Sequence, residues 1–239
     1  MLQGTPNPLA PYTLVATAAR LGHSIGLHRW LDDFGLSEEQ ADERRNVFWI
    51  LFIIDKGMSL QSGRPSIIQD QDIGVSLPKA KPDQFFPSGK RVFNTFIVSA
   101  KLALIESRVY SELYSARART RSVLQRLVAI GKLDSELQKL RDFIPLEIRP
   151  QHEIVCDERQ LLPVILLHHS YYNCVTAVHR VSIYHGPWTS DPGDQQLPHH
   201  GVNLNPRVYE SERICVESAR HAIGTLKYFE RDRPPPMVW

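Results

Sequence analysis

The pattern of apolar and polar positions is helical along most of the chain. Leu14, Ala18, Leu21 and Ile25 recur every three or four residues, which predicts an amphipathic helix over residues 12–27. Gly26 ends this stripe, as expected of a glycine near a helix C-terminus. Residues 1–11 contain three prolines and are predicted to be a turn-rich segment.

A second, longer helix is predicted from residue 37 to about residue 60. Ser37 and Gln40 have the spacing of a capping box, in which each side chain satisfies a backbone amide of the other residue. Within this helix Val47 to Ile54 are apolar on every side. A helix that is apolar all round is normally buried, so we expect a central, fully buried helix.

The rest of the chain gives at least four more helical patterns and two long irregular segments. Gly131 is a predicted weak point, and residues 61–89 and 186–205 are rich in turn-forming residues. No alternation bounded by hairpin signals predicts a strand. The predicted fold is therefore an all-α domain of six or more helices with two long irregular loops. The further helices are marked by residues 93–104, by residues 124–140, by residues 163–184 and by residues 206–231.

Composition places the chain among globular proteins. It has 239 residues, 42% hydrophobic and 23% charged, and these values are ordinary for one large domain. With 28 basic and 26 acidic residues the net charge is +2, which gives no reason to expect strong duplex-DNA binding. The local basic cluster Arg117, Arg119, Arg121 and Arg126 is interpreted as a solvated helix start, with contact to DNA or an acidic partner as the alternative.

Cysteine usage and hydropathy indicate the redox compartment of the chain and whether it spans a membrane. Cys156, Cys174 and Cys215 are far apart and odd in number, which fits a reducing compartment and not a disulfide framework. The longest apolar run has eight residues, whereas a membrane helix needs about 20. We therefore expect no membrane partner.

An ordered series of short motifs carries a family resemblance. The first part of the series lies between residues 26 and 78. The second part comprises Leu166 to Asn173, Val178-His179-Arg180 and Ile214 to Arg220. The series closely resembles the middle homology region of fungal transcription factors that carry a binuclear zinc cluster. Val181 replaces the family's usual proline, so we expect that helix to continue past Arg180. The first and more specific motifs are Gly26-Leu27-His28-Arg29, Glu43 to Trp49, Ile54-Asp55, Gly63-Arg64-Pro65, Asp70 to Ile73 and Leu77-Pro78.

The resemblance implies a regulatory domain spanning residues 1–239, excised at both ends from a longer nuclear regulator. Such a domain restrains or switches the activator and helps to choose its partner or DNA target. DNA contact and zinc are implied only for the zinc-cluster domain, which needs six cysteines and is absent from this chain. The partners left open are a second copy of the chain, a small-molecule effector and a transcriptional co-regulator.

The structural and regulatory residue candidates come from these motifs. We favour structural roles for most of them, with partner or DNA contact as the alternative. For Asp70 and Asp72 a loop-anchoring role is favoured, and the alternatives are plain surface charge and paired-carboxylate catalysis. Phe48, Trp49 and Phe52 are interpreted as core, with an effector pocket as the alternative. The candidates are Gly26, Leu27, His28, Arg29, Arg44, Arg45, Trp49, Asp55, Gly63, Arg64, Pro65, Asp70 and Asp72.

Arg64 is expected to anchor the segment that follows the second helix. Gly63 permits a tight turn, and Pro65 restrains Arg64 to extended backbone angles. Guanidinium groups suit bidentate carboxylate pairing, so Asp55, Asp70 or Asp72 is the expected partner.

Catalytic and metal-binding patterns are weak. Gly22-His23-Ser24-Ile25-Gly26 matches the serine-hydrolase elbow in letters, but no strand is predicted before it. His168-His169 and His199-His200 are adjacent pairs, and adjacent helical residues do not share a face. We therefore expect no catalytic residue, cofactor or metal site in this chain.

Two other functional classes remain open from the sequence. A structural dimerisation module would show a large apolar patch on the last helix and no internal pocket. An enzyme or carrier of apolar ligands would show a deep pocket containing a group of strongly shifted pKa. Pocket and core residues look alike in a sequence, so only a structure separates these alternatives.

Overall fold

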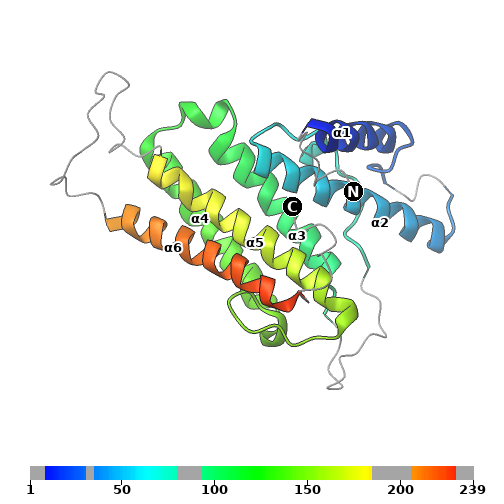
Figure 1. Ribbon diagram of the computed structural model, residues 1–239. Coiled ribbons are helices and arrows are strands. Elements are labelled where there is room, and N and C mark those ends of the chain that lie inside the picture. Colours follow the sequence, from blue (N-terminus) through cyan, green and yellow to red (C-terminus); the bar gives the residue numbers. More distant parts are fainter. Residues whose placement is uncertain (1–8, 31–34, 80–92, 185–205, 230–239) are drawn as a thin grey trace.

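The computed structural model describes residues 9–30, 35–79, 93–184 and 206–229. Within these ranges the chain forms six α-helices and no strand, which confirms the all-α prediction (Figure 1). Short 3-10 and π-helical turns join several of the helices. The helices are α1 (Leu9–Ser24), α2 (Glu38–Ser62), α3 (Thr95–Val109), α4 (Val123–Phe143), α5 (Glu158–Tyr184) and α6 (Pro206–Gly224).

Local capping signals explain where the helices begin. The predicted capping box at α2 is present, with Ser37 and Gln40 each bonding the other's backbone amide. Ser122 and Gln125 form a second capping box at α4, and the Asn94 side chain caps α3. Because these bonds satisfy amides that have no partner inside the helix, they fix each start locally.

Some predicted boundaries differ from the observed ones. α1 starts at Leu9, within the segment predicted as turns, and Gly131 does not interrupt α4. α5 starts at Glu158, so Pro163 lies inside the helix and not in its first turn. α5 does continue past Arg180, to Tyr184, as expected from Val181. The predicted loop over residues 186–205 and the predicted helix end near residue 231 lie outside the described residues.

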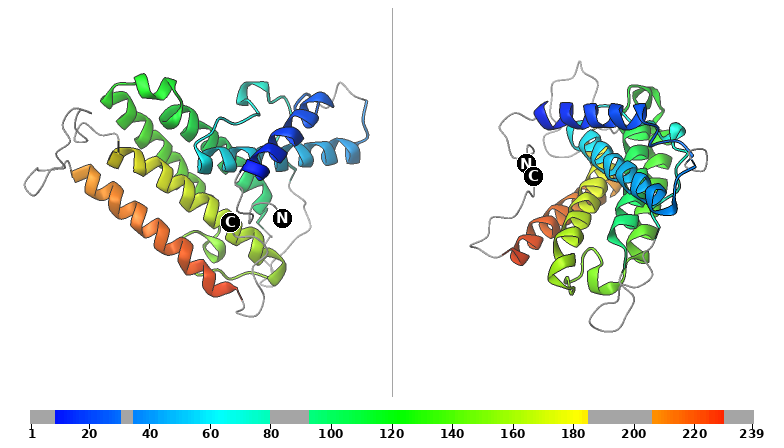
Figure 2. Two further views of the ribbon diagram at one scale, coloured as in Figure 1. Left: turned by 45° about the horizontal axis from the view of Figure 1, so that its top comes forward. Right: turned by 90° about the vertical axis from the view of Figure 1, so that its right-hand side faces the viewer.

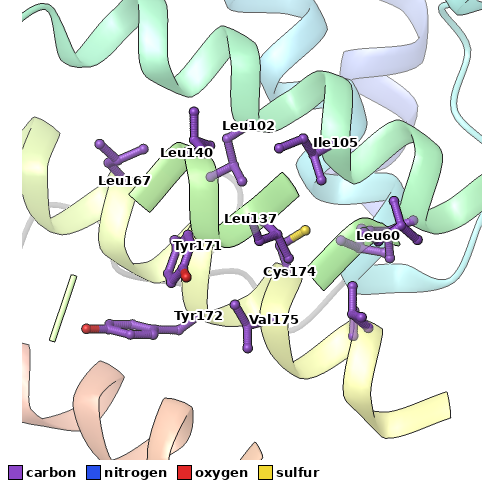
Figure 3. Close-up of a cluster of buried hydrophobic side chains, with 14 of the residues drawn as sticks. Leu60, Leu102, Ile105, Leu137, Leu140, Leu167, Tyr171, Tyr172, Cys174 and Val175 are labelled. Atoms are coloured by element: carbon purple, nitrogen blue, oxygen red, sulfur yellow. The ribbon is translucent and has the colours of Figure 1, made fainter. Parts of the chain in front are cut away.

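α3 is the central helix of the domain. It packs against α2 on one side and against α4 and α5 on the other, while α6 lies along α5 and α1 lies against α2 (Figures 1 and 2). The larger core cluster fills the space among α3, α4 and α5, and includes Leu102, Leu137 and Tyr171 (Figure 3). These contacts make α3, α4 and α5 the scaffold on which the other elements rest.

The prediction that Val47 to Ile54 form a fully buried helix is wrong on one side. Phe48 and Phe52 are buried in a second core cluster between α1, α2 and α3. Val47, Ile50 and Ile54, however, expose 42%, 49% and 38% of their surface. α2 has helical neighbours on only part of its circumference, so a helix that is apolar all round keeps an uncovered face.

The apolar stripe of α1 also points away from the core. Ala19 and Gly22 face α2, and a Cβ at Gly22 would lie 3.1 Å from Leu51 Cδ1. Small residues thus allow the two helices to approach closely, while Leu14, Leu21 and Ile25 are exposed. No helix in the described ranges is both long and apolar enough to cross a membrane.

Candidate functional site

The segment after α2, residues 64–79, is called the α2 loop here, and Asp55 and Lys56 of α2 hold it in place. The Asp55 carboxylate accepts hydrogen bonds from the amides of Ile67 at 3.1 Å and Ile68 at 3.0 Å. The Lys56 ammonium donates to the Ile68 carbonyl at 2.5 Å and pairs with Asp70 at 2.9 Å. Both α2 side chains are buried, so the loop supplies the partners that their charges need.

Two more motif residues hold the far end of the α2 loop. Arg45 pairs with Asp42 and donates to the Ser76 hydroxyl at 3.0 Å. Trp49 donates its indole N–H to the Ser76 carbonyl at 2.8 Å. Arg45 and Trp49 are both buried, which supports a structural role for both of them.

The turn after α1 joins the same assembly. Gly26 adopts φ of 73°, a left-handed conformation that favours glycine, and Leu27 is buried behind it. The Arg44 guanidinium donates to the Ile25 carbonyl at 2.5 Å, and the His28 carbonyl accepts from the Gly74 amide at 2.8 Å. Arg29, by contrast, is exposed in this turn.

Arg64 does not pair with Asp55, Asp70 or Asp72, the described carboxylates expected as its partners. Its guanidinium lies over the Tyr12 ring, 5.2 Å from the centroid, and the Tyr12 hydroxyl donates to the Pro65 carbonyl at 3.0 Å. Gly63 caps α2 with φ of 67°, a left-handed conformation that favours glycine. Asp55 and Asp70 are occupied by other groups, so the anchoring role expected of Arg64 is carried by Lys56.

Asp70 and Asp72 have different surroundings. Asp70 bridges Lys56 of α2 and the Ser107 hydroxyl of α3, which donates at 2.8 Å. Asp72 is exposed and lies near His28, where its charge opposes the burial that lowers the pKa of that imidazole. The two carboxylates therefore do not form an acid–base pair.

The remaining chemical motifs have structural surroundings. Ser24, within the elbow-like letters, belongs to α1 and donates to the Leu21 carbonyl at 2.7 Å. His168 bonds the Ile148 carbonyl and His169 bonds the Thr225 hydroxyl, so the two rings are directed to different partners. Within the described ranges, no three His, Cys, Asp or Glu side chains gather closely enough to hold a metal ion.

The basic cluster stabilises the turn before α4. Arg126 donates to the carbonyls of Arg121 and Arg119, and Arg121 pairs with Glu112 at 3.4 Å. These bonds support the interpretation of the cluster as part of a helix start.

The Phe48, Trp49 and Phe52 rings of α2 pack against one another with centroids 5.2–6.1 Å apart. All three side chains are buried, which supports their interpretation as core residues over that of an effector pocket.

A separate groove of about 380 Å³ lies between α2, α3 and α5, and it contains the buried carboxyl group of Glu106. We call it the Glu106 groove. Burial raises the Glu106 pKa to about 8. The sequence prediction missed this residue. Glu106 follows Leu102 by four positions, so a carboxylate on a buried apolar stripe was the available signal.

Comparisons with known proteins agree with the helical fold and the motif series. Residues 1–142 match the model of the fungal specific transcription factor domain. The ABC-transporter-regulating transcription factor of Aspergillus oryzae is 45% identical over 236 residues, covering 95% of this chain and 26% of that protein. The Aspergillus fumigatus protein of the same description is 44% identical with the same coverage.

A more distant relative extends the pattern. The Fusaridione A cluster transcription factor of Fusarium heterosporum is 32% identical and covers 96% of this chain and 44% of that protein. This chain thus spans 26% to 44% of the length of these three relatives. No solved structure matches it. The family match covers more than half of the chain, and the chain belongs to the fungal specific transcription factor domain family of transcription regulators.

Proposed function

We propose that this chain is the regulatory helical domain of a longer fungal zinc-cluster transcription factor. The observation that carries the proposal is the 45% identity over 95% of this chain to a segment that makes up 26% of an Aspergillus oryzae transcription factor. In this proposal DNA is contacted through a zinc cluster outside the chain, the full-length protein is nuclear, and the helical domain catalyses no reaction.

The proposed regulatory mechanism is a change of packing. The domain would favour one arrangement in the restrained activator and another when an effector, a co-regulator or a second copy binds. Uncovered apolar faces on α1, α2 and α6 supply surfaces on which partners could be exchanged. They include Leu21 of α1, Ile50 of α2 and Ile223 of α6, which expose 62%, 49% and 67% of their surface.

The relatives' names also suggest the target genes. Two Aspergillus proteins with 45% and 44% identity are described as ABC-transporter-regulating transcription factors. We therefore propose that the full-length protein controls transcription of ABC-transporter genes.

A segment exchange tests the regulatory role. The corresponding segment of the Aspergillus oryzae factor is deleted or replaced by this chain, and ABC-transporter transcripts are measured with and without an inducing treatment. We expect the deletion to lose regulated transcription and the replacement to restore it. The matched control is the more distant Fusarium heterosporum segment. A deletion that leaves regulation intact would overturn the proposal, and so would a well-expressed replacement that behaves like the deletion.

A dimerisation module is the second candidate, and the surface of α6 favours it. Tyr209, Val216 and Ile223 are exposed and follow one another at seven-residue spacing, which places them along one helix face. Sedimentation equilibrium of the wild type and of Val216→Glu tests this. A wild-type dimer that the substitution dissociates supports the module, whereas a monomer at all concentrations overturns it.

Zinc is proposed to be confined to the absent DNA-binding domain. The three cysteines are separated in sequence, and the part of the chain that the structure describes contains no three-ligand group. Elemental analysis of the purified, chelator-dialysed chain should find well below one zinc per chain. One zinc per chain would contradict this proposal.

A further inference from the structure

The Glu106 groove has walls from three helices and is mainly apolar. Its volume of about 380 Å³ lies in the range of small-molecule pockets. Two of its wall residues, Ile54 and Leu166, are 38% and 44% exposed, so the groove is accessible from solvent. The apolar walls include Ile50, Ile54, Phe96, Leu102, Leu166 and Leu167.

One carboxyl group stands out among these walls. Glu106 exposes only 2% of its surface, and its Oε1 atom has no hydrogen-bond partner among the described residues. A buried, unpaired polar atom costs about 1–3 kcal/mol, and native proteins retain few of them. Inside an accessible groove, the Glu106 carboxyl group therefore lacks a hydrogen-bond or charge partner from the described part of the chain. This indicates a ligand that supplies the partner.

The surroundings of Glu106 favour a positively charged partner. Among the described residues that line the groove, Glu106 is the only ionisable one, and no lysine, arginine or histidine is included. On the α2 side, a Cβ added to Gly57 would still lie 3.9 Å from Glu106 Oε2, so the carboxyl is not crowded there. Burial raises the pKa of the Cys174 thiol on α5, and the Glu106 charge acts in the same direction. A thiol is neutral when protonated, so Cys174 brings no positive charge to the groove.

We propose that the Glu106 groove binds an apolar amine, with its hydrocarbon body between α2, α3 and α5 and its ammonium group on the Glu106 carboxylate. A carboxylate ligand would meet a buried acid with no neutralising cation, and a neutral alcohol would leave the groove without an ion pair. An amine places its body against the apolar walls and pairs its charge with the Glu106 carboxylate, whereas an alcohol offers the carboxyl group only a hydrogen bond. The role of this amine as an effector rests on the proposed regulatory function, whereas its binding to the groove does not.

Proton release gives a direct signature of this ion pair. Burial raises the Glu106 pKa to about 8, so at neutral pH the empty groove holds the protonated acid. An ammonium ligand pairs with the carboxylate, so its binding sends the Glu106 proton to solvent while the amine keeps its own. The expected release is about one proton per ligand, because the ammonium charge stabilises the ionised acid.

The experiment uses three probes with one hydrocarbon body: 4-phenylbutylamine, 4-phenylbutanol and 4-phenylbutyrate. Calorimetric titration at neutral pH in two buffers of different ionisation enthalpy measures affinity and proton release together. We expect the amine to bind the wild type about tenfold more tightly than the alcohol. The carboxylate should bind least, and only the amine should release a proton.

Matched variants locate the site. Glu106→Gln keeps the size of the side chain, and should bring amine and alcohol affinities together and abolish proton release. Ser99→Leu adds bulk to the groove wall and should weaken all three probes, whereas Ser135→Leu, on an exposed position of α4, should weaken none. Circular dichroism confirms folding of each variant, and Ser170→Leu on the α5 wall replaces Ser99→Leu if the latter does not fold.

Several results would overturn the proposal. These are equal wild-type affinity for amine and carboxylate, an amine preference that survives Glu106→Gln, binding that survives the wall substitution, or no binding of any probe at millimolar concentration. None of these results bears on the segment exchange, which reads transcription. Conversely, a failed segment exchange leaves the binding measurement valid, so the two proposals fail separately.

Discussion

At the scale of single residues, Asp55 and Lys56 explain why the α2 loop keeps its place. They are adjacent in α2. The Asp55 carboxylate accepts hydrogen bonds from two loop amides, while the Lys56 ammonium donates to a loop carbonyl and pairs with Asp70. The two opposite charges thus satisfy backbone groups of both polarities at one bend of the loop. Arg64, which lies over an aromatic ring at the start of the loop, contributes a weaker contact.

Substitutions of these residues should therefore differ in cost. Asp55→Ala leaves the amides of Ile67 and Ile68 without their acceptor, and we expect a loss of about 3 kcal/mol in the free energy of unfolding. Asp55→Asn keeps one acceptor oxygen and should cost less. Arg64→Ala should cost below about 1 kcal/mol. Chemical denaturation measures all three, and a cost of Arg64→Ala equal to that of Asp55→Ala would contradict this ranking.

Glu106 should make folding stability depend on pH. The folded chain holds the Glu106 proton to about pH 8, whereas the unfolded chain releases it near the ordinary pKa of 4.5. The stability from this protonated carboxyl is fully present below the unfolded pKa and is lost as the pH rises through the folded pKa. Between about pH 5 and pH 8 the wild type should lose on the order of 3 kcal/mol relative to Glu106→Gln.

Denaturation of both proteins at several pH values in this window measures the difference. The Glu106→Gln variant removes only this titration, so other ionisable groups cancel in the comparison. A difference in unfolding free energy that stays constant from about pH 5 to pH 8 would show that Glu106 has an ordinary pKa in the folded chain.

At the scale of elements, α1 approaches α2 through small residues of α1, and both helices keep several aliphatic residues exposed. Ala19 and Gly22 of α1 allow close approach to α2, while Leu14 and Leu21 occupy the outer side of α1. The longest apolar side chains of α1 therefore contribute little to the folding of the isolated chain.

This arrangement predicts an inverted mutational pattern in α1. Leu21→Gln should change the free energy of unfolding by less than about 0.5 kcal/mol, because the side chain is already exposed. Ala19→Leu should cost about 1–3 kcal/mol, because Ala19 is 1% exposed and a larger side chain would be forced into packed surroundings. Thermal and chemical denaturation compare the two variants. A Leu21→Gln cost as large as that of Ala19→Leu would show that the stripe of α1 is covered.

At the scale of the whole molecule, this chain is a helical scaffold with a fixed loop, an accessible groove and uncovered apolar faces. Its net charge is +2, and two arginines of the basic cluster, Arg121 and Arg126, are already bonded to a neighbouring carboxylate and to carbonyls. Those bonds reduce the number of guanidinium groups available to phosphates. The proposed regulatory role therefore needs no DNA contact by this domain.

The isolated chain should accordingly show no sequence-specific DNA binding. Zinc-cluster modules read the major groove with a helix of their own, and the six cysteines of such a module are not in this sequence. Titration of labelled duplexes at physiological salt should give only weak, sequence-independent binding. Nanomolar affinity that depends on the duplex sequence would require a DNA-reading surface on the helices described here.

The sequence by itself determined the helical class, the family and the starts of several helices. Ser37 with Gln40 caps α2 through bonds that span three residues, and such local bonds can be inferred from spacing alone. The glycine at position 63 ends α2 for an equally local reason, because a left-handed φ suits glycine.

Only the tertiary structure decided which faces are covered and which charges meet. Lys56, and not Arg64, pairs with Asp70. Ile50 and Ile54 belong to a stretch of α2 that is apolar all round, yet they border a groove and are not buried. Glu106 became a candidate only when α2 and α5 enclosed it with α3. These outcomes depend on how helices distant in sequence pack together. A periodic pattern defines the faces of a helix, but it does not define the neighbour of each face.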